Sequence, residues 1–227
     1  MATIFMALSG GIDSTVLLAN LLSEGYKVTT CFFKYGSKHN EREELAANEV
    51  TAYYKVKGSI VDMTDIFDTS SSALLARNML RPIPPTGYQE VGSLAATVVP
   101  GRNTVFASAL ASFAEAEALQ SEKTTFIALG IHGGDHALYP DCRPQYADAL
   151  AKLIHISTEG RVGFMAPMVH WTKAKIVESG IALSAPLHLT WSCYEGKEAA
   201  CGKCGTCRER LAAFESAGVR DPIAYAG

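Results

Sequence analysis

The segment Leu8-Ser9-Gly10-Gly11-Ile12-Asp13-Ser14-Thr15 follows an apolar run, Thr3–Leu8, and precedes apolar residues at helical spacing. This order predicts a strand, a glycine turn and a helix that ends near Gly25. Units of this kind build parallel α/β sheets, so the segment decides the fold class.

The rest of the chain continues the alternation of strand and helix. We therefore predict an α/β fold with a doubly wound, mainly parallel sheet that helices cover on both faces. The stretch 78–101 has little periodicity and predicts a long loop, a feature that is often functional in compact domains. The expected strands are Lys27–Phe33, Ser59–Met63 and Thr124–Leu129, and the expected helices are Glu41–Tyr54, Asn103–Ala118, one after Arg143-Pro144 and one opened by Thr172.

The turn between the first strand and the first helix has the composition of an anion site. Backbone N–H groups and the positive end of a helix dipole meet there, and paired glycines let a phosphate approach the backbone. Asp13 can hold a magnesium ion on the phosphate oxygens. Neither a Gly-Lys-Ser/Thr nor a third glycine follows, which excludes the Walker loop and the dinucleotide fingerprint. The alternative is a plain turn in which Asp13 or Ser14 caps the helix.

Two later segments carry candidate binding residues. Arg102 lies near a helix N-terminus, where a cation opposes the dipole, so we predict a phosphate contact; a solvated arginine with Asn103 as the helix cap is the alternative. In the turn Tyr139–Pro144, Asp141 can accept hydrogen bonds from a guanine-like edge and Arg143 can pair with a carboxylate. An ordinary ion pair between Asp141 and Arg143 remains the alternative there.

Four of the six cysteines lie close together near the end of the chain. Their spacing is too tight for a disulfide framework and suits tetrahedral thiolate coordination of zinc, with an iron–sulfur cluster as the main rival. Four protein ligands leave no open position, so the predicted role of the metal is structural. The four residues are Cys193, Cys201, Cys204 and Cys207.

Composition sets limits on the class of protein. With 227 residues, 48% of them hydrophobic, the chain can bury a large core. The net charge of −3 offers no overall basic field, which makes nucleic acid an improbable partner. No apolar run reaches the length of a membrane span, and Met1–Leu8 contains no positive region, so we expect a cytoplasmic protein without a membrane partner.

Taken together, these motifs make the chain resemble the 7-cyano-7-deazaguanine synthase family of the ATP pyrophosphatase superfamily. The resemblance covers most of the chain, and its first motif marks only the superfamily, whereas the last two motifs together are close to family-specific. It rests on the segment Leu8–Thr15, Tyr35-Gly36 with His39, Val99–Thr104, Tyr139–Pro144, Thr172-Lys173, Thr190–Tyr194 and the cysteine tail.

The resemblance implies an enzyme of the carbon–nitrogen ligase class that contains a fold of the adenine nucleotide α-hydrolase type. It implies that 7-carboxy-7-deazaguanine, ammonia and ATP give first the amide and then the nitrile, with release of AMP and pyrophosphate. It also implies one structural zinc, a requirement for magnesium and a homodimer. Free ammonia is the expected nitrogen source, because no unassigned stretch is long enough for a glutamine-hydrolysing domain.

The implied organisation is an ATP pyrophosphatase domain over residues 1–185 and a zinc-binding segment over 186–227 packed on it. Candidate substrate residues are Tyr139, Asp141, Arg143, Asp135 and Lys173, although Lys173 has solvation as its alternative.

Two positions depart from the family pattern: Lys34, where an acidic residue is usual, and the segment His132–Leu138, which we expect to be more polar. Both can line the site. They leave open a member that stops at the amide for DNA modification, or a tRNA-modifying ATP pyrophosphatase. A third possibility is a non-enzymatic zinc module that binds nucleic acid or protein, supported by Lys203, Arg208 and Arg210.

Overall fold

A computed structural model describes residues 2–78, 97–135 and 139–226, and its centre is a five-stranded sheet in which every pairing is parallel. The order β3-β2-β1-β4-β5 places the first strand in the middle. The strands are β1 (Thr3–Ala7), β2 (Lys27–Lys34), β3 (Lys57–Asp62), β4 (Thr125–Ala128) and β5 (Val162–Met165).

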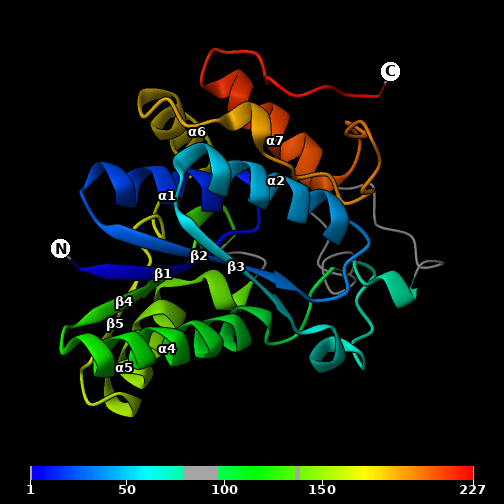
Figure 1. Ribbon diagram of the computed structural model, residues 1–227. Helices are drawn as coiled ribbons and strands as arrows, with labels where there is room; N and C mark the ends of the chain where they lie inside the picture. Colours follow the sequence, from blue (N-terminus) through cyan, green and yellow to red (C-terminus); the bar gives the residue numbers. More distant parts are fainter. Residues whose placement is uncertain (1, 79–96, 136–138, 227) are drawn as a thin grey trace.

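Helices cover both faces of the sheet, which confirms the predicted doubly wound α/β class (Figure 1). One layer contains α1 (Ile12–Ser23), α2 (Asn40–Tyr54), α6 (Lys173–Ala182) and α7 (Gly205–Ser216). The opposite layer contains α4 (Arg102–Ser121) and α5 (Pro144–Ser157). The chain winds outward from β1 in one direction and from β4 in the other, so the carboxyl ends of β1 and β4 form the switch point where ligands bind in such sheets.

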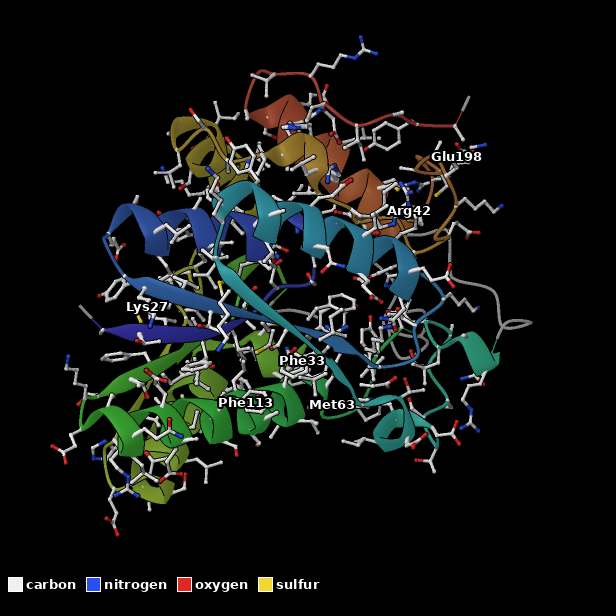
Figure 2. The ribbon with its side chains drawn as sticks, in the orientation of Figure 1. Lys27, Phe33, Arg42, Met63, Phe113 and Glu198 are labelled. Atoms are coloured by element: carbon white, nitrogen blue, oxygen red, sulfur yellow. The ribbon has the colours of Figure 1, made fainter. Side chains whose placement is uncertain are left out.

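Alternate side chains of β1 pack into two separate hydrophobic cores, one on each face of the sheet. Ile4 and Met6 are fully buried beneath α1, whereas Phe5 and Ala7 pack toward α4 on the other face. Phe33 of β2 points toward α4, and its ring stacks on Phe106 at 4.4 Å between centroids (Figure 2). Burial on both faces explains why the central strands β1 and β4 read as apolar runs, whereas the edge strand β3 is largely exposed.

Two elements were not expected from the sequence. β5 has four residues, and Gly163 at its second position leaves room for the ring of Phe126, from which an added Cβ would lie 2.5 Å away. α7 begins within the cysteine cluster, whose metal-binding pattern masked its helical spacing; Ala213 and Phe214 on α7 join the core beneath α1. Among the described residues, no helix has the combination of length and hydropathy needed to cross a bilayer.

A buried ion pair holds the end of the chain against this core. Arg210 of α7 is fully buried and donates two hydrogen bonds to Asp221, of 2.7 and 2.9 Å. Its remaining donors contact the hydroxyl of Thr190 at 2.7 Å and the carbonyl oxygen of Leu187 at 3.2 Å. One guanidinium therefore connects α7, the segment before the cysteines and the C-terminal residues.

Removal of Asp221 should destabilise the protein strongly, because it leaves the guanidinium of Arg210 buried without its counter-ion. Breaking one side of such a pair costs about 3–5 kcal/mol, so we expect Asp221→Ala to lower the free energy of unfolding by this amount in urea titrations. Glu178→Ala is the matched control: Glu178 forms an exposed pair with Lys175 at 3.7 Å, and its loss should cost below about 1 kcal/mol. Equal losses for the two variants would contradict the assignment.

Candidate active site

A cavity of about 460 Å³ opens at the switch point of the sheet. Its walls come from the loop after β1, the segment after β2, the N-terminal turn of α4, the segments after β4 and the C-terminal tail. The sequence places glycines, prolines and polar residues at all of these strand ends, which is why chain segments far apart in sequence meet there.

The loop after β1 has the geometry of an anion site. Gly10 has φ +76°, and Gly11, the N-cap of α1, has no side-chain cap. The first-turn N–H groups of α1 therefore have no acceptor within the helix and face a cavity that Gly11, Asp13 and Ser14 line. The hydroxyl of Ser14 donates to the carbonyl oxygen of Gly11 at 3.2 Å. The alternative in which Asp13 or Ser14 caps the helix is wrong.

Asp13 is at the centre of a charged cluster. Lys173 donates to Asp13 Oδ2 at 2.7 Å and lies 3.8 Å from Glu209, while His132 Nε2 lies 3.7 Å from the same Asp13 oxygen. Desolvation acts to raise the pKa of Asp13, but the charge of Lys173 and the hydrogen bond from it outweigh this effect, so the pKa lies below its ordinary value. Asp13 is ionised at neutral pH, and its second oxygen is buried with no hydrogen-bond partner among the described residues.

His132 belongs to this cluster, and a backbone hydrogen bond fixes the tautomer of its ring. The backbone N–H of Gly134 donates to His132 Nδ1 at 3.1 Å, which leaves the proton of a neutral ring on Nε2, facing Asp13. The histidine has a relative exposure of 1%. The sequence does not predict this role, because no residue near His132 in the chain indicates that Asp13 is its partner.

A second polar cluster lies on the α2 side of the cavity. Arg102 donates to the hydroxyl of Tyr35 at 3.5 Å, and that hydroxyl lies 3.5 Å from His39 Nε2. The same histidine nitrogen lies 3.5 Å from Glu43 Oε1. Asn103 does not cap α4, because Gly101 is the N-cap and Asn103 instead donates to the carbonyl oxygen of Asp141 at 3.4 Å.

Burial changes the protonation of this second cluster. Desolvation raises the pKa of Glu43 to about 8, since the charge of Arg102 and the Ser37 hydroxyl only partly offset it. Desolvation, with the charge of Arg102, lowers the pKa of His39 to about 4. At neutral pH His39 is therefore neutral, while Glu43 titrates close to physiological pH.

One part of the cavity lining is apolar, and we call it the chamber. The stacked rings of Phe33 and Phe106, with Cys31 and Cys142, form one wall. Tyr139 closes the wall, and its hydroxyl lies 3.2 Å from that of Thr97. A lining of this kind suits a flat heterocycle, and Asp141, which also lines the cavity, can contact polar edge atoms.

The structure places the predicted site residues as follows. Most of them line this one cavity: Leu8, Ser9, Gly11, Ile12, Asp13, Ser14, Arg102, Tyr139, Asp141 and Lys173. Gly10 and Thr15 support the loop from behind, and Thr15 is fully buried. Lys173 is largely buried and paired, so its solvated alternative is wrong.

Two of the expected positions do not line the cavity. Arg143 is exposed and is not among the described residues that line the cavity. Lys34 is not among them either, and its ammonium group lies 2.8 Å from the carboxylate of Glu44. The side chain of Asp135 lies outside the described residues.

The cavity is also lined by residues that the sequence does not mark as site residues; they come from α2, from the Thr190–Tyr194 motif and from the cysteine tail: Glu43, Trp191, Ser192, Thr206 and Glu209. The acidic face of α2 gave no signal that distinguished Glu43 from its solvated neighbours.

The four clustered cysteines form a compact sulfur site. Their Sγ atoms all lie within 4.8 Å of one another, close to the ~3.8 Å between sulfurs expected from ~2.3 Å zinc–sulfur bonds in a tetrahedron. The backbone N–H groups of Lys203 and Cys204 donate to Cys201 Sγ at 3.4 and 3.3 Å, a pattern that stabilises thiolates. The donor set therefore fits a tetrahedral metal ion.

Together, the switch-point cavity, the uncapped helix N-terminus and the Asp13–Lys173 pair define an enzyme of the phosphate-loop α/β class that binds a nucleotide. The family model "Queuosine biosynthesis protein QueC" matches residues 3–218, and the chain belongs to this family.

Individual relatives agree with the family match. The 7-cyano-7-deazaguanine synthase of Caldicellulosiruptor saccharolyticus is 41% identical over 97% of this chain and 94% of its own length. That of Methanoregula boonei is 39% identical over 97% of each chain. Among solved structures, NMN synthetase from Francisella tularensis is similar with a TM-score of 0.47 and 14% identity, over 96% of this chain and 77% of that one.

The buried carboxyl of Glu43 makes a prediction about stability. A carboxyl whose folded pKa of about 8 exceeds its ordinary 4.5 stabilises the folded state below pH 4.5, and this contribution is lost as pH rises through 8. Between pH 5 and 9 the wild type should therefore lose up to roughly 4 kcal/mol that Glu43→Gln does not lose, at about 1.4 kcal/mol per pKa unit. Urea unfolding at both pH values measures it, and identical pH dependence of the two proteins would refute it.

Proposed function

We propose that this protein is a 7-cyano-7-deazaguanine synthase: a carbon–nitrogen ligase that uses ATP to convert 7-carboxy-7-deazaguanine and ammonia to the nitrile through the amide. The observation that carries the proposal is the junction of a phosphate loop and an apolar, aromatic chamber in one cavity. Names of relatives that cover nearly the whole chain support it. The same phosphate loop would bind ATP twice, once for activation of the acid oxygen and once for activation of the amide oxygen.

The ATP phosphates are assigned to the first turn of α1 and the loop Leu8–Thr15, with Arg102 across the cavity as a further contact. Lys173, held by Asp13 and Glu209, supplies a positive charge where the phosphates would lie. The unpartnered oxygen of Asp13 fits a hard divalent cation, and magnesium bound there would neutralise charge on the phosphates. These residues orient ATP so that its α-phosphorus faces the apolar chamber.

The deazapurine is assigned to the chamber formed by Phe33, Phe106 and Tyr139, with Asp141 accepting hydrogen bonds from its guanine-like edge. The predicted pairing of Arg143 with the substrate carboxylate has no support from the geometry, because Arg143 does not line the cavity. The apolar part of the lining would limit the access of water to an adenylated intermediate.

Mass spectrometry of products tests the proposal directly. Purified protein incubated with 7-carboxy-7-deazaguanine, ammonium, magnesium and ATP should yield the nitrile with AMP and pyrophosphate. The amide as sole product would indicate an enzyme that stops halfway. Absence of both products would overturn the proposal. A homodimer and a cytoplasmic location remain predictions from the sequence, and light scattering after size exclusion tests the first.

Zinc is the metal we assign to the cysteine site, in a structural role. Elemental analysis should find one zinc per chain, and Cys204→Ser should lose it. We expect the loss to lower the melting temperature and to weaken ATP binding, because Ser192, Thr206 and Glu209 of the same segment line the cavity. Cys31→Ser, a buried thiol outside the cluster, should retain full zinc content. Iron with acid-labile sulfide would contradict the assignment.

A further inference from the structure

The proposed reaction, on which this inference rests, releases protons from nitrogen in a cavity whose lining is partly apolar. When ammonia attacks the adenylated acid, the new nitrogen bears a positive charge and must lose one proton as AMP departs. When the amide is adenylated and AMP departs again, the nitrogen must lose two protons to become a nitrile. A positioned proton acceptor near the chamber would accelerate both steps.

The described acidic side chains that line the cavity are not equivalent as proton acceptors. Asp13 pairs with Lys173, whose charge lowers the pKa of Asp13 and makes it a weak base, and Glu209 lies 3.8 Å from the same ammonium group. His39 is held neutral with a low pKa, so it too accepts a proton poorly. Asp141 also lines the cavity, and it is assigned to the polar edge of the substrate.

Glu43 differs from these groups in its surroundings. Its side chain is 16% exposed and lines the cavity, and among the described residues no lysine or arginine nitrogen lies within 4.0 Å of its carboxylate. The groups that face it are His39 at 3.5 Å and, through their fields or hydroxyls, Arg102 and Ser37. Tyr35, whose pKa desolvation raises to about 12, is protonated beside them.

The backbone fixes Glu43 in this position. It lies in the first turn of α2, where its N–H donates to the carbonyl oxygen of His39 at 3.0 Å. Its own carbonyl oxygen is in close contact with Gly10, since a Cβ added there would lie 2.8 Å from it. The carboxylate is therefore attached to the same point of the fold that shapes the phosphate loop.

We propose that Glu43 is the general base that removes protons from the reacting nitrogen. In the first half-reaction ammonia forms the C–N bond, Glu43 takes one proton from that nitrogen, and the C–O bond to AMP breaks with its electron pair leaving on AMP. In the second half-reaction the amide oxygen displaces pyrophosphate from ATP. Cleavage of the C–O bond then completes the triple bond, with one nitrogen proton passing to Glu43 and the other to water.

An isotope-exchange experiment separates this role from binding. With 7-carboxy-7-deazaguanine, ATP and magnesium but no ammonium, exchange of labelled pyrophosphate into ATP reports adenylation and its reversal alone. Glu43→Gln should exchange within threefold of the wild type and with an unchanged KM for the acid. Its formation of amide and nitrile should fall at least about 100-fold, the contribution typical of a general base. Glu43→Asp should recover part of this loss.

Glu49→Gln, an exposed acidic position on the same helix, is the matched control and should behave as the wild type in both assays. Loss of exchange in parallel with product in Glu43→Gln would assign Glu43 to binding or folding and overturn the proposal. Product formation within tenfold of the wild type would also overturn it. Absence of exchange in the wild type itself would instead refute the proposed function.

The pH dependence gives an independent readout. With 7-amido-7-deazaguanine as substrate no ammonium is needed, so its titration does not interfere. Nitrile formation requires ionised Glu43, whose pKa is about 8, and kcat should rise with pH through this value and then level off. In Glu43→Gln this rise should be absent. A rise retained at the same pH in the variant would assign it to another group and overturn the proposal.

Discussion

The close contact at Gly10 is the constraint on which the rest of the structure depends. A Cβ at this position would lie 2.6 Å from the backbone nitrogen of Ala47 on α2, and φ is +76°, so only glycine fits without movement of the backbone. Its carbonyl oxygen accepts the N–H of Trp191 at 2.8 Å. The phosphate loop, α2 and the C-terminal tail therefore meet at one residue, and each holds the others in register.

From this junction the cavity acquires two regions of opposite electrostatic character. At the α1 end, Lys173 keeps Asp13 ionised, which suits the phosphates and a cation. At the α2 end, burial leaves Glu43 with a pKa of about 8, since no lysine or arginine nitrogen of the described residues lies within 4.0 Å of it, so it can accept and release protons. Two carboxylates in one cavity thus differ in function because their neighbours differ, and not because of their chemical type.

Patterns along the chain were sufficient for the fold class and for one half of the site. The strand, glycine turn and helix around Leu8–Thr15 depend on local sequence, and four cysteines at close spacing carry their own chemistry, so both were predictable. β5 was not predictable from the sequence, because the glycine at position 163 is explained only by the ring of Phe126 on the neighbouring strand. Glu43 and His132 also depend on long-range contacts: the burial of one and the partner of the other arise only when distant segments pack together.

The metal-binding tail cannot be separated from the active site. A tail of this length has little core of its own, so a metal held by Cys193, Cys201, Cys204 and Cys207 would supply much of its folding free energy. In the folded tail, Thr206 and Glu209 line the cavity. The N–H of Trp191, in the same tail, donates to the carbonyl oxygen of Gly10. The cation–π contact of Arg42 with Trp191 at 4.3 Å and its hydrogen bond to the carbonyl of Glu198 at 3.3 Å tie the same tail to α2 (Figure 2). A metal held at this closed site would therefore support the shape of the phosphate loop without contacting the substrate, since the loop, α2 and the tail share one junction.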